Sequence, residues 1–477
     1  MESTAHTFKE NVDDALQKEN LKTAMRRLET TIGPARLAAR DRLPEFDALC
    51  DLAREIKDHT LANLDVYLEN YEAKVRAQGG HVHWCATPEE ARQKILDLCR
   101  AADAKTVTKG KSMIAEEIGL NDFLEANDIE PIETDLGEYI IQLAGEPPSH
   151  IIAPAVHMTK EDIADLFFEK HQIYDMPRRE EPRELVDDAR KILRPKYGAA
   201  DVGITGANFL IAETGSSIIV TNEGNGDLTQ SLPKTHIVVA SLEKVVPTLA
   251  DVTTILRVLA RSATGQEFST YTTFSTGPRR DGDLDGPENY HVVLLDNGRS
   301  AMLGGEFRDM LRCIRCGACM NNCPVYGSIG GHAYGWVYVG PMGAVLTPSL
   351  IGLEDAHDLP NASSFCGRCE EVCPMRIPLP KLMRLLREQA FTEKLAPARE
   401  RWAMRVWAAL ATRPRLYRAL SEAVARVLGN SGWRRGAFRY LPFAGGWLAG
   451  RDLPAPEGRT FHSLWRERTR LEARAGR

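Results

Sequence analysis

Cys313-Ile-Arg-Cys-Gly-Ala-Cys-Met-Asn-Asn-Cys-Pro324 is the stretch that decides how the middle of this 477-residue chain folds. Its cysteines have the spacing C-x2-C-x2-C-x3-C-P of bacterial runs that hold cubane iron–sulfur clusters. In such a run the first three thiolates bind one cluster, and the fourth, which precedes the proline, binds the other. A structural zinc site fits less well, because it uses two separated pairs of ligands. The stretch therefore predicts a domain with two clusters.

A second cysteine run, Cys366-x2-Cys369-x3-Cys373-Pro374, repeats the end of the first run, and Ser363 stands where its first cysteine would be. The crossing rule assigns cluster one to Cys313, Cys316, Cys319 and Cys373, and cluster two to Cys323, Cys366 and Cys369. We expect both clusters to be of the [4Fe-4S] type, although cluster two lacks a fourth cysteine ligand. Its fourth ligand stays open between the Ser363 oxygen, water and a remote residue, and an empty corner would make it [3Fe-4S].

The overall composition excludes several classes of protein. With 43% hydrophobic and 26% charged residues the chain is an ordinary globular protein, and its net charge of -6 gives no reason to expect nucleic acid as a partner. The first residues contain no signal peptide, and no apolar run reaches the roughly 18 residues of a membrane span, so we expect a cytoplasmic protein. Thiols stay reduced in that compartment, so the ten cysteines are expected as ligands or core residues.

The chain on either side of the cysteine runs divides into further regions. Residues 1–78 have apolar side chains at spacings of three and four, which predict helices. Residues 79–303 alternate strand-like with helix-like sequence, which predicts an α/β domain with a largely parallel sheet, and the cluster domain follows at 304–390. The expected strands are His81–Trp84, Thr106–Thr108, Ile129–Ile132, His150–Ala153, Ser217–Val220, His236–Ala240 and His291–Leu295.

The last region, residues 391–477, differs in composition from the rest of the chain. It has 18 Lys and Arg residues against 7 Asp and Glu, and it holds five of the seven tryptophans. Arginine with tryptophan is typical of membrane surfaces and also of protein interfaces. We expect this basic extension to contact a partner protein, with peripheral membrane contact as the alternative.

Further distinctive segments accompany the two cysteine runs. They are Gly331-His-Ala-Tyr-Gly, Gly340-Pro-Met-Gly-Ala-Val-Leu-Thr-Pro, Lys111-Ser-Met-Ile-Ala-Glu-Glu, Glu133-Thr-Asp-Leu-Gly-Glu and Gly206-Ala-Asn-Phe-Leu-Ile-Ala-Glu-Thr-Gly-Ser. With these segments the sequence resembles the lactate utilisation protein B family of iron–sulfur proteins. The resemblance implies that the α/β domain is a LUD-type domain, similar in fold to the sugar-phosphate isomerases and CoA-transferases. It also implies an α-helical, ferredoxin-type cluster domain and a basic C-terminal extension.

The resemblance implies a role in oxidising L-lactate to pyruvate, together with a second iron–sulfur protein and a smaller LUD-domain protein. We expect this chain to transfer electrons and not to be catalytic alone, because no G-x-G-x-x-G follows a strand to bind NAD or FAD. The alternative is an enzyme whose α/β domain itself binds and oxidises a small hydroxy acid. In a CoA-transferase-like fold a carboxylate could act as nucleophile, and the candidates are Glu133, Asp135, Glu138 and Glu213. Helix capping or solvation is the simpler interpretation of these residues. No catalytic residue follows from the sequence.

Overall fold

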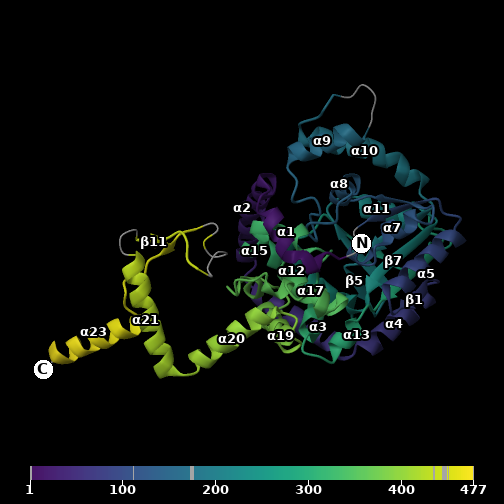
Figure 1. Ribbon diagram of the computed structural model, residues 1–477. Helices are drawn as coiled ribbons and strands as arrows, with labels where there is room; N and C mark the ends of the chain where they lie inside the picture. Colours follow the sequence, from purple (N-terminus) through teal and green to yellow (C-terminus); the bar gives the residue numbers. More distant parts are fainter. Residues whose placement is uncertain are drawn as a thin grey trace. The chain divides into compact units, whose positions relative to one another are not determined.

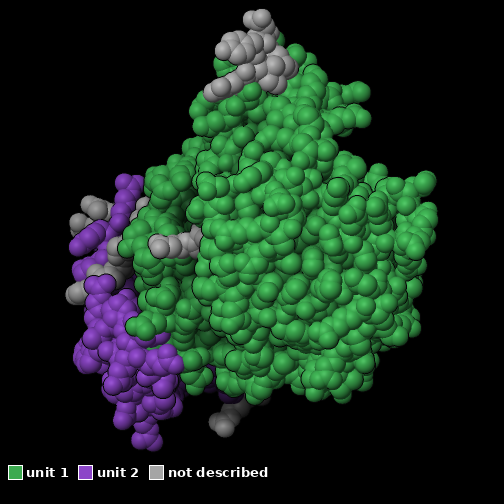
Figure 2. Space-filling view, turned by 90° about the vertical axis from the view of Figure 1, so that its right-hand side faces the viewer, with its two compact units in different colours: residues 1–390 green, residues 391–477 purple. Residues whose placement is uncertain are grey.

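The computed structural model describes residues 3–110, 112–171, 177–432, 436–442, 448 and 451–475. The chain forms two compact units, residues 1–390 and residues 391–477, which Figure 2 draws in different colours. The finer boundaries predicted inside the first unit, after residues 78 and 303, stay predictions.

The first unit begins with helices, as the apolar spacing predicts. They are a short 3-10 helix η1 (Ala5–Thr7) followed by α1 (Phe8–Ala15), α2 (Glu19–Asp41), α3 (Phe46–Ala62) and α4 (Leu64–Ala77). In these helices the buried side chains lie along one face. In α3 this face includes Leu49, Ala53 and Ile56. Helix α3 packs against α12 (Leu249–Ala263), and α2 packs against α15 (Pro324–Ile329), so the N-terminal helices contact both later parts of the unit.

A six-stranded parallel sheet forms the centre of the α/β part (Figure 1). Its strand order is β1-β10-β7-β4-β2-β3. The bounds are β1 (His81–Cys85), β10 (Asn289–Leu295), β7 (Thr235–Ser241), β4 (Val202–Gly206), β2 (Thr106–Gly110) and β3 (Glu130–Glu133). Every residue of β7 is buried, as expected when both faces of a parallel sheet are covered.

Different elements cover the two faces of this sheet. One face packs against α5 (Pro88–Ala101), α6 (Met113–Glu117) and α7 (Leu120–Glu125), and the other packs against α4 and part of a second sheet. Helix α5 starts where the Thr87 hydroxyl accepts the Glu90 N–H at 3.3 Å, with Pro88 as its first residue. The predicted parallel α/β architecture is therefore confirmed.

The second sheet was not predicted as a separate element. It contains β8 (Val245–Val246), β5 (Phe209–Ile211), β6 (Ser216–Thr221) and β9 (Tyr271–Ser275) in that order, with antiparallel pairing at β6. The strand expected at Ser217–Val220 lies here, outside the parallel sheet. The strand expected at His150–Ala153 is wrong: this segment is irregular, and Ser149 N–H bonds back to the Pro154 carbonyl at 3.0 Å. In sequence this short apolar run looks like a buried strand, but it belongs to a loop.

The other elements of the first unit are helical. In the α/β part they are α8 (Leu136–Ala144), α9 (Lys160–Lys170), α10 (Pro182–Ala199), α11 (Asn225–Ser231), η2 (Leu242–Lys244) and α13 (Arg299–Leu303); α9 and α10 lie side by side (Figure 1). The cysteine-rich part contains η3 (Arg308–Arg312), α14 (Ala318–Asn321), α15, η4 (His332–Tyr334), α16 (Gly340–Ile351), α17 (Leu353–Ala356), η5 (Leu359–Asn361), α18 (Arg368–Glu371) and α19 (Leu379–Thr392). Helix α16 is buried along most of its length, because it is apolar all round.

The described residues of the second unit form helices and a short antiparallel pair of strands. Its elements are α20 (Ala398–Ala411), α21 (Pro414–Gly432), β11 (Ala437–Phe438), β12 (Leu453–Pro454) and α23 (Phe461–Ala475). Trp402 and Trp407 are 68% and 59% exposed, while Trp433 and Trp447 lie outside the described residues. Among the helices of the described residues, none combines the length and apolar character that a membrane crossing requires.

Candidate functional site: two sets of cysteines beside a polar cavity

The two cysteine runs adopt the same backbone conformation at matching positions. Gly317 and Gly367, each of which follows a cysteine, have φ values of 72° and 80°. Arg315 and Phe365, each of which precedes that cysteine, have φ values of 60° and 54°. Left-handed backbone is uncommon for residues other than glycine, so its occurrence at paired positions is informative. The pairing of the two runs is thus a structural repeat as well as a sequence repeat.

The cysteines predicted to bind cluster one lie together. Cys313, Cys316, Cys319 and Cys373 line one small cavity, which Met342 and Ile377 also line. The structure thereby brings the first three thiols of one run to the last thiol of the other. This placement supports the crossed assignment, and the ligation itself stays a prediction.

Deprotonation of the buried thiols of Cys316, Cys319 and Cys373 is costly unless a cation binds the thiolates. Burial raises the pKa of Cys316 and Cys319, and the neighbouring sulfur atoms raise it further. Burial likewise raises the pKa of Cys373 to about 11. Crowded, buried thiolates need compensating positive charge, which the irons of a cluster would supply. The donor set therefore fits an iron–sulfur cluster.

The cysteines predicted to bind cluster two are less enclosed. Cys369 is buried, Cys323 is half-buried and Cys366 is exposed. Burial raises the pKa of Cys369 to about 12, and the nearby Cys323 thiol adds to this shift. The Ser363 hydroxyl accepts the Phe365 N–H at 3.1 Å, so in this conformation it stabilises a local turn. The fourth ligand of cluster two stays open between the alternatives given above.

We expect about seven to eight irons per chain after anaerobic purification, because one full [4Fe-4S] set and one set with a single missing thiol are present. Iron and sulfide analysis with electron paramagnetic resonance (EPR) would measure this content and separate [4Fe-4S] from [3Fe-4S] signals. Two irons or fewer in a fully loaded sample, or zinc in stoichiometric amount, would contradict the cluster prediction.

A buried ion network connects the α/β part with the first cysteine run. Arg299 binds Glu117 with two hydrogen bonds of 2.9 and 2.6 Å, and it forms an ion pair with Glu243 at 3.1 Å. Arg315, between two cluster-one cysteines, donates to Glu243 at 3.2 Å, and Tyr338 donates to Glu117 at 2.5 Å. Burial acts to raise the pKa of Glu243, but the positive charges of Arg299 and Arg315 outweigh it and lower this pKa to about 2. Glu243 is therefore a carboxylate at neutral pH.

The irregular segment around His150 forms a second connection. His150 Nδ1 accepts the Ile152 N–H at 3.1 Å, so its Nε2 donates to the Asn321 side chain at 2.9 Å. Burial lowers the pKa of His150 to about 4, which keeps the ring neutral at pH 7. Gly331 approaches the same segment so closely that a Cβ there would lie 1.9 Å from the Ser149 carbonyl oxygen. The predicted strand is in fact the surface against which the first cysteine run packs.

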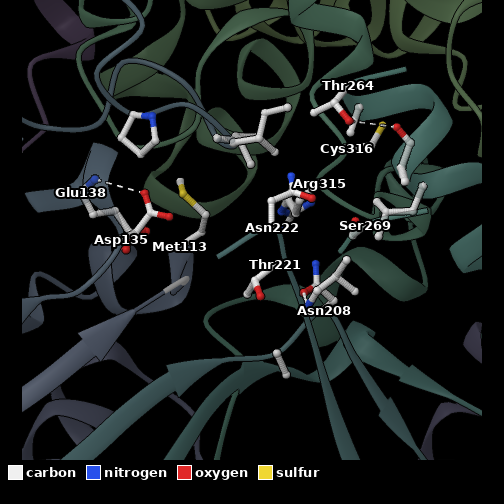
Figure 3. Close-up of a pocket in the computed structure, with 18 of the residues that line it drawn as sticks. Met113, Asp135, Glu138, Asn208, Thr221, Asn222, Thr264, Ser269, Arg315 and Cys316 are labelled. Carbon is white, nitrogen blue, oxygen red and sulfur yellow. Dashed lines mark hydrogen bonds between the residues drawn. The ribbon is translucent and has the colours of Figure 1, made fainter. Parts of the chain in front are cut away.

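A cavity of about 200 Å³ lies between the α/β part and the predicted cluster one (Figure 3). The polar and sulfur-bearing residues that line it include Asp135, Glu138, Asn208, Thr221, Asn222, Lys244, Arg315 and Cys316. Burial and the charge of Arg315 lower the pKa of Lys244 to about 7, and an anion in the cavity would favour its ammonium form. No local motif marks this cavity in the sequence, because its residues come from many separate segments.

The carboxylates considered from the sequence divide into two groups. Asp135 and Glu138 line the cavity, and Asp135 also caps α8 by accepting the Gly137 N–H at 3.0 Å. Glu133 pairs instead with the buried Lys109 at 2.6 Å, and Glu213 accepts the Leu249 N–H at 3.1 Å. Capping and pairing therefore account for three of these four carboxylates, namely Asp135, Glu133 and Glu213. Lys111, which begins one of the segments that carry the family resemblance, lies outside the described residues.

Three family models match successive parts of the chain. The model of the LUD domain matches residues 68–295, the model of the 4Fe-4S dicluster domain matches residues 309–377, and the C-terminal model of lactate utilisation protein B matches residues 386–470.

Similar proteins match over nearly the whole chain. "Lactate utilization protein B" of Bacillus velezensis is 44% identical and covers 97% of both chains, and its namesake of Bacillus subtilis is 43% identical over 98% of this chain and 97% of its own. The "Uncharacterized electron transport protein YkgF" of Escherichia coli is 42% identical over 98% of both chains. With its cysteine runs, LUD domain and C-terminal region all matched, this chain belongs to the lactate utilisation protein B family.

Proposed function

We propose that the chain is the electron-transfer subunit in the oxidation of L-lactate to pyruvate, with two iron–sulfur clusters as its redox groups. The observation that carries this proposal is that Cys313, Cys316 and Cys319 of the first run line one cavity with Cys373 of the second, and that both runs belong to one compact unit. The printed names of the relatives, which refer to lactate utilisation and electron transport, support the same function.

The two predicted clusters differ in how exposed their cysteines are, and this indicates which cluster exchanges electrons with a partner protein. The cysteines of cluster one are buried or half-buried, whereas Cys366 of cluster two is exposed at the surface. A redox partner reaches an exposed cluster most easily, so cluster two is the exchange point with the second iron–sulfur subunit. The smaller LUD-domain protein completes the proposed complex, and the basic extension contacts one of these partners in preference to a membrane.

The arrangement of the two sheets supports a proposal about the fold relationship of the LUD domain. The parallel sheet with helices on one face and a second sheet on the other suits the proposed relation of the LUD domain to sugar-phosphate isomerases and CoA-transferases. Fold relationship alone assigns no chemistry, so the proposed function rests on the cysteines.

We expect the isolated, cluster-loaded chain not to oxidise lactate, because cubane clusters carry single electrons whereas lactate oxidation removes two. A dye-linked assay would measure lactate turnover by this chain alone and by the chain mixed with the second iron–sulfur subunit and the LUD-domain protein. Turnover is expected only in the mixture. Robust turnover by the pure chain would instead establish the alternative, in which the α/β domain itself is the enzyme.

A further inference from the structure

Two buried cations face the cavity beside the predicted cluster one. Lys244 from η2 and Arg315 from the first cysteine run line it, and they are only 7% and 8% exposed. Cys316 lines the same cavity, so whatever occupies it lies against a cluster-one ligand (Figure 3). Burying cations is costly unless they are paired with an anion or with hydrogen-bond acceptors.

The protein pairs these cations incompletely. Arg315 donates to Glu243 through Nη2, and its face contacts the Tyr338 ring at 5.0 Å, but its buried Nη1 has no hydrogen-bond partner within the described ranges. Lys244 has no hydrogen-bond or ion-pair partner in the described part of the chain either. The cavity therefore offers an unused guanidinium N–H and an ammonium group to an outside ligand.

The shape and remaining walls indicate which anion fits. At about 200 Å³ the cavity is smaller than the roughly 300–1,000 Å³ of drug-sized ligand sites, so it suits a molecule of a few heavy atoms. Ile151, Leu259 and Ala263 give it apolar walls for a short carbon chain. Asp135 and Glu138 lie across the view from Cys316 in Figure 3 and repel a carboxylate, which leaves the cationic side for it.

We infer that this cavity binds a small carboxylic acid, whose carboxylate contacts Arg315 and Lys244 and whose carbon chain lies along the apolar wall. The inference deepens the proposed function, since it gives the acid a place in this chain beside cluster one. It does not require that the bound acid reacts there. A guanidinium with a free N–H suits a planar carboxylate, and the adjacent ammonium adds charge without fixed geometry.

Isothermal titration calorimetry on the anaerobic, cluster-loaded chain tests this site with L-lactate, pyruvate, the neutral analogue lactamide and inorganic phosphate. We expect lactate or pyruvate to bind at least about tenfold more tightly than lactamide. Lys244→Met should weaken binding of the acid by about tenfold or more. The EPR signal of reduced cluster one should also shift on binding, because Cys316 borders the cavity.

Lys57→Met is the matched control. Lys57 is also a buried lysine beside residues 243–245, where it donates to the Glu243 and Val245 carbonyls, but it does not line the cavity. Lys57→Met should leave the affinity for the acid unchanged. Arg315→Lys is a second test variant, and if it loses cluster one, Lys244→Met still decides the matter.

Three results would overturn the inference: no binding of either acid, equal affinity in the wild type and Lys244→Met, or tighter binding of phosphate than of both acids. Iron content and electron transfer to the partner subunit, measured on the same samples, report separately on the proposed function. A chain that transfers electrons but binds no acid would refute the site and leave that function standing.

Discussion

Cys373→Ser is expected to remove cluster one, although Cys373 belongs to the second cysteine run. Its thiol lines the same cavity as Cys313, Cys316 and Cys319, and a serine hydroxyl is a harder and poorer ligand for iron than a thiolate. The iron content should fall by about four per chain, the content of one cubane. EPR of the reduced protein should show the signal of cluster two alone.

Two further variants make this result specific. Cys369→Ser alters the same run but should damage only cluster two. Cys50→Ser alters a buried thiol of α3 that is outside both sets, and should leave the iron content unchanged. If Cys373→Ser kept cluster one and lost only cluster two, each run would serve its own cluster, and the crossed assignment would be wrong.

Arg299→Met is expected to destabilise the first unit by about 3–5 kcal/mol, the usual effect of removing one partner from a buried ion pair. The change leaves Glu117 and Glu243 without their shared cation, and both carboxylate side chains are at most 2% exposed. Methionine has a similar length, so lost charge and not lost volume dominates. Thermal unfolding of the cluster-loaded chain under anaerobic conditions would measure the loss.

The control for Arg299→Met is an exposed ion pair. Arg257 and Glu45 are 36% and 50% exposed and 2.6 Å apart, and Arg257→Gln should leave the melting temperature almost unchanged, because solvent screens this pair. The double variant Arg299→Met with Glu117→Gln should recover part of the loss, because one buried charge is removed. Equal melting temperatures for Arg299→Met and Arg257→Gln would show that the network contributes little.

The sequence was most informative where a local pattern decides the structure. The cysteine spacing anticipated that Cys373 would lie with Cys313, because short ligand loops leave few geometries around one cluster. The strands of the parallel sheet were expected at β1, β2, β3, β7 and β10, since buried strands read as apolar runs bounded by turns.

Other features depend on contacts between distant segments, and there the sequence misled or was silent. The segment at His150 was predicted as a strand, because an apolar run looks the same whether it pairs with strands or packs as a loop. Strand β4 begins with Val202 and contains two glycines, so it was missed. The cavity joins Lys244 to Arg315, residues from separate segments with no shared motif.

The packing of residues 149–150 against the first cysteine run also has a consequence for the order in which the parts of the chain fold during synthesis. The ribosome releases this segment, and Arg36 of α2, long before it reaches Cys313; the Arg36 side chain later donates to the Val372 carbonyl at 2.9 Å. During synthesis, N-terminal domains generally fold before C-terminal ones. The nascent α/β part thus presents a receiving surface to the cysteine loops as they emerge, before any metal has to be delivered. If cluster one takes a ligand from each run, as predicted, its metal can be enclosed only once Cys373 has emerged as well.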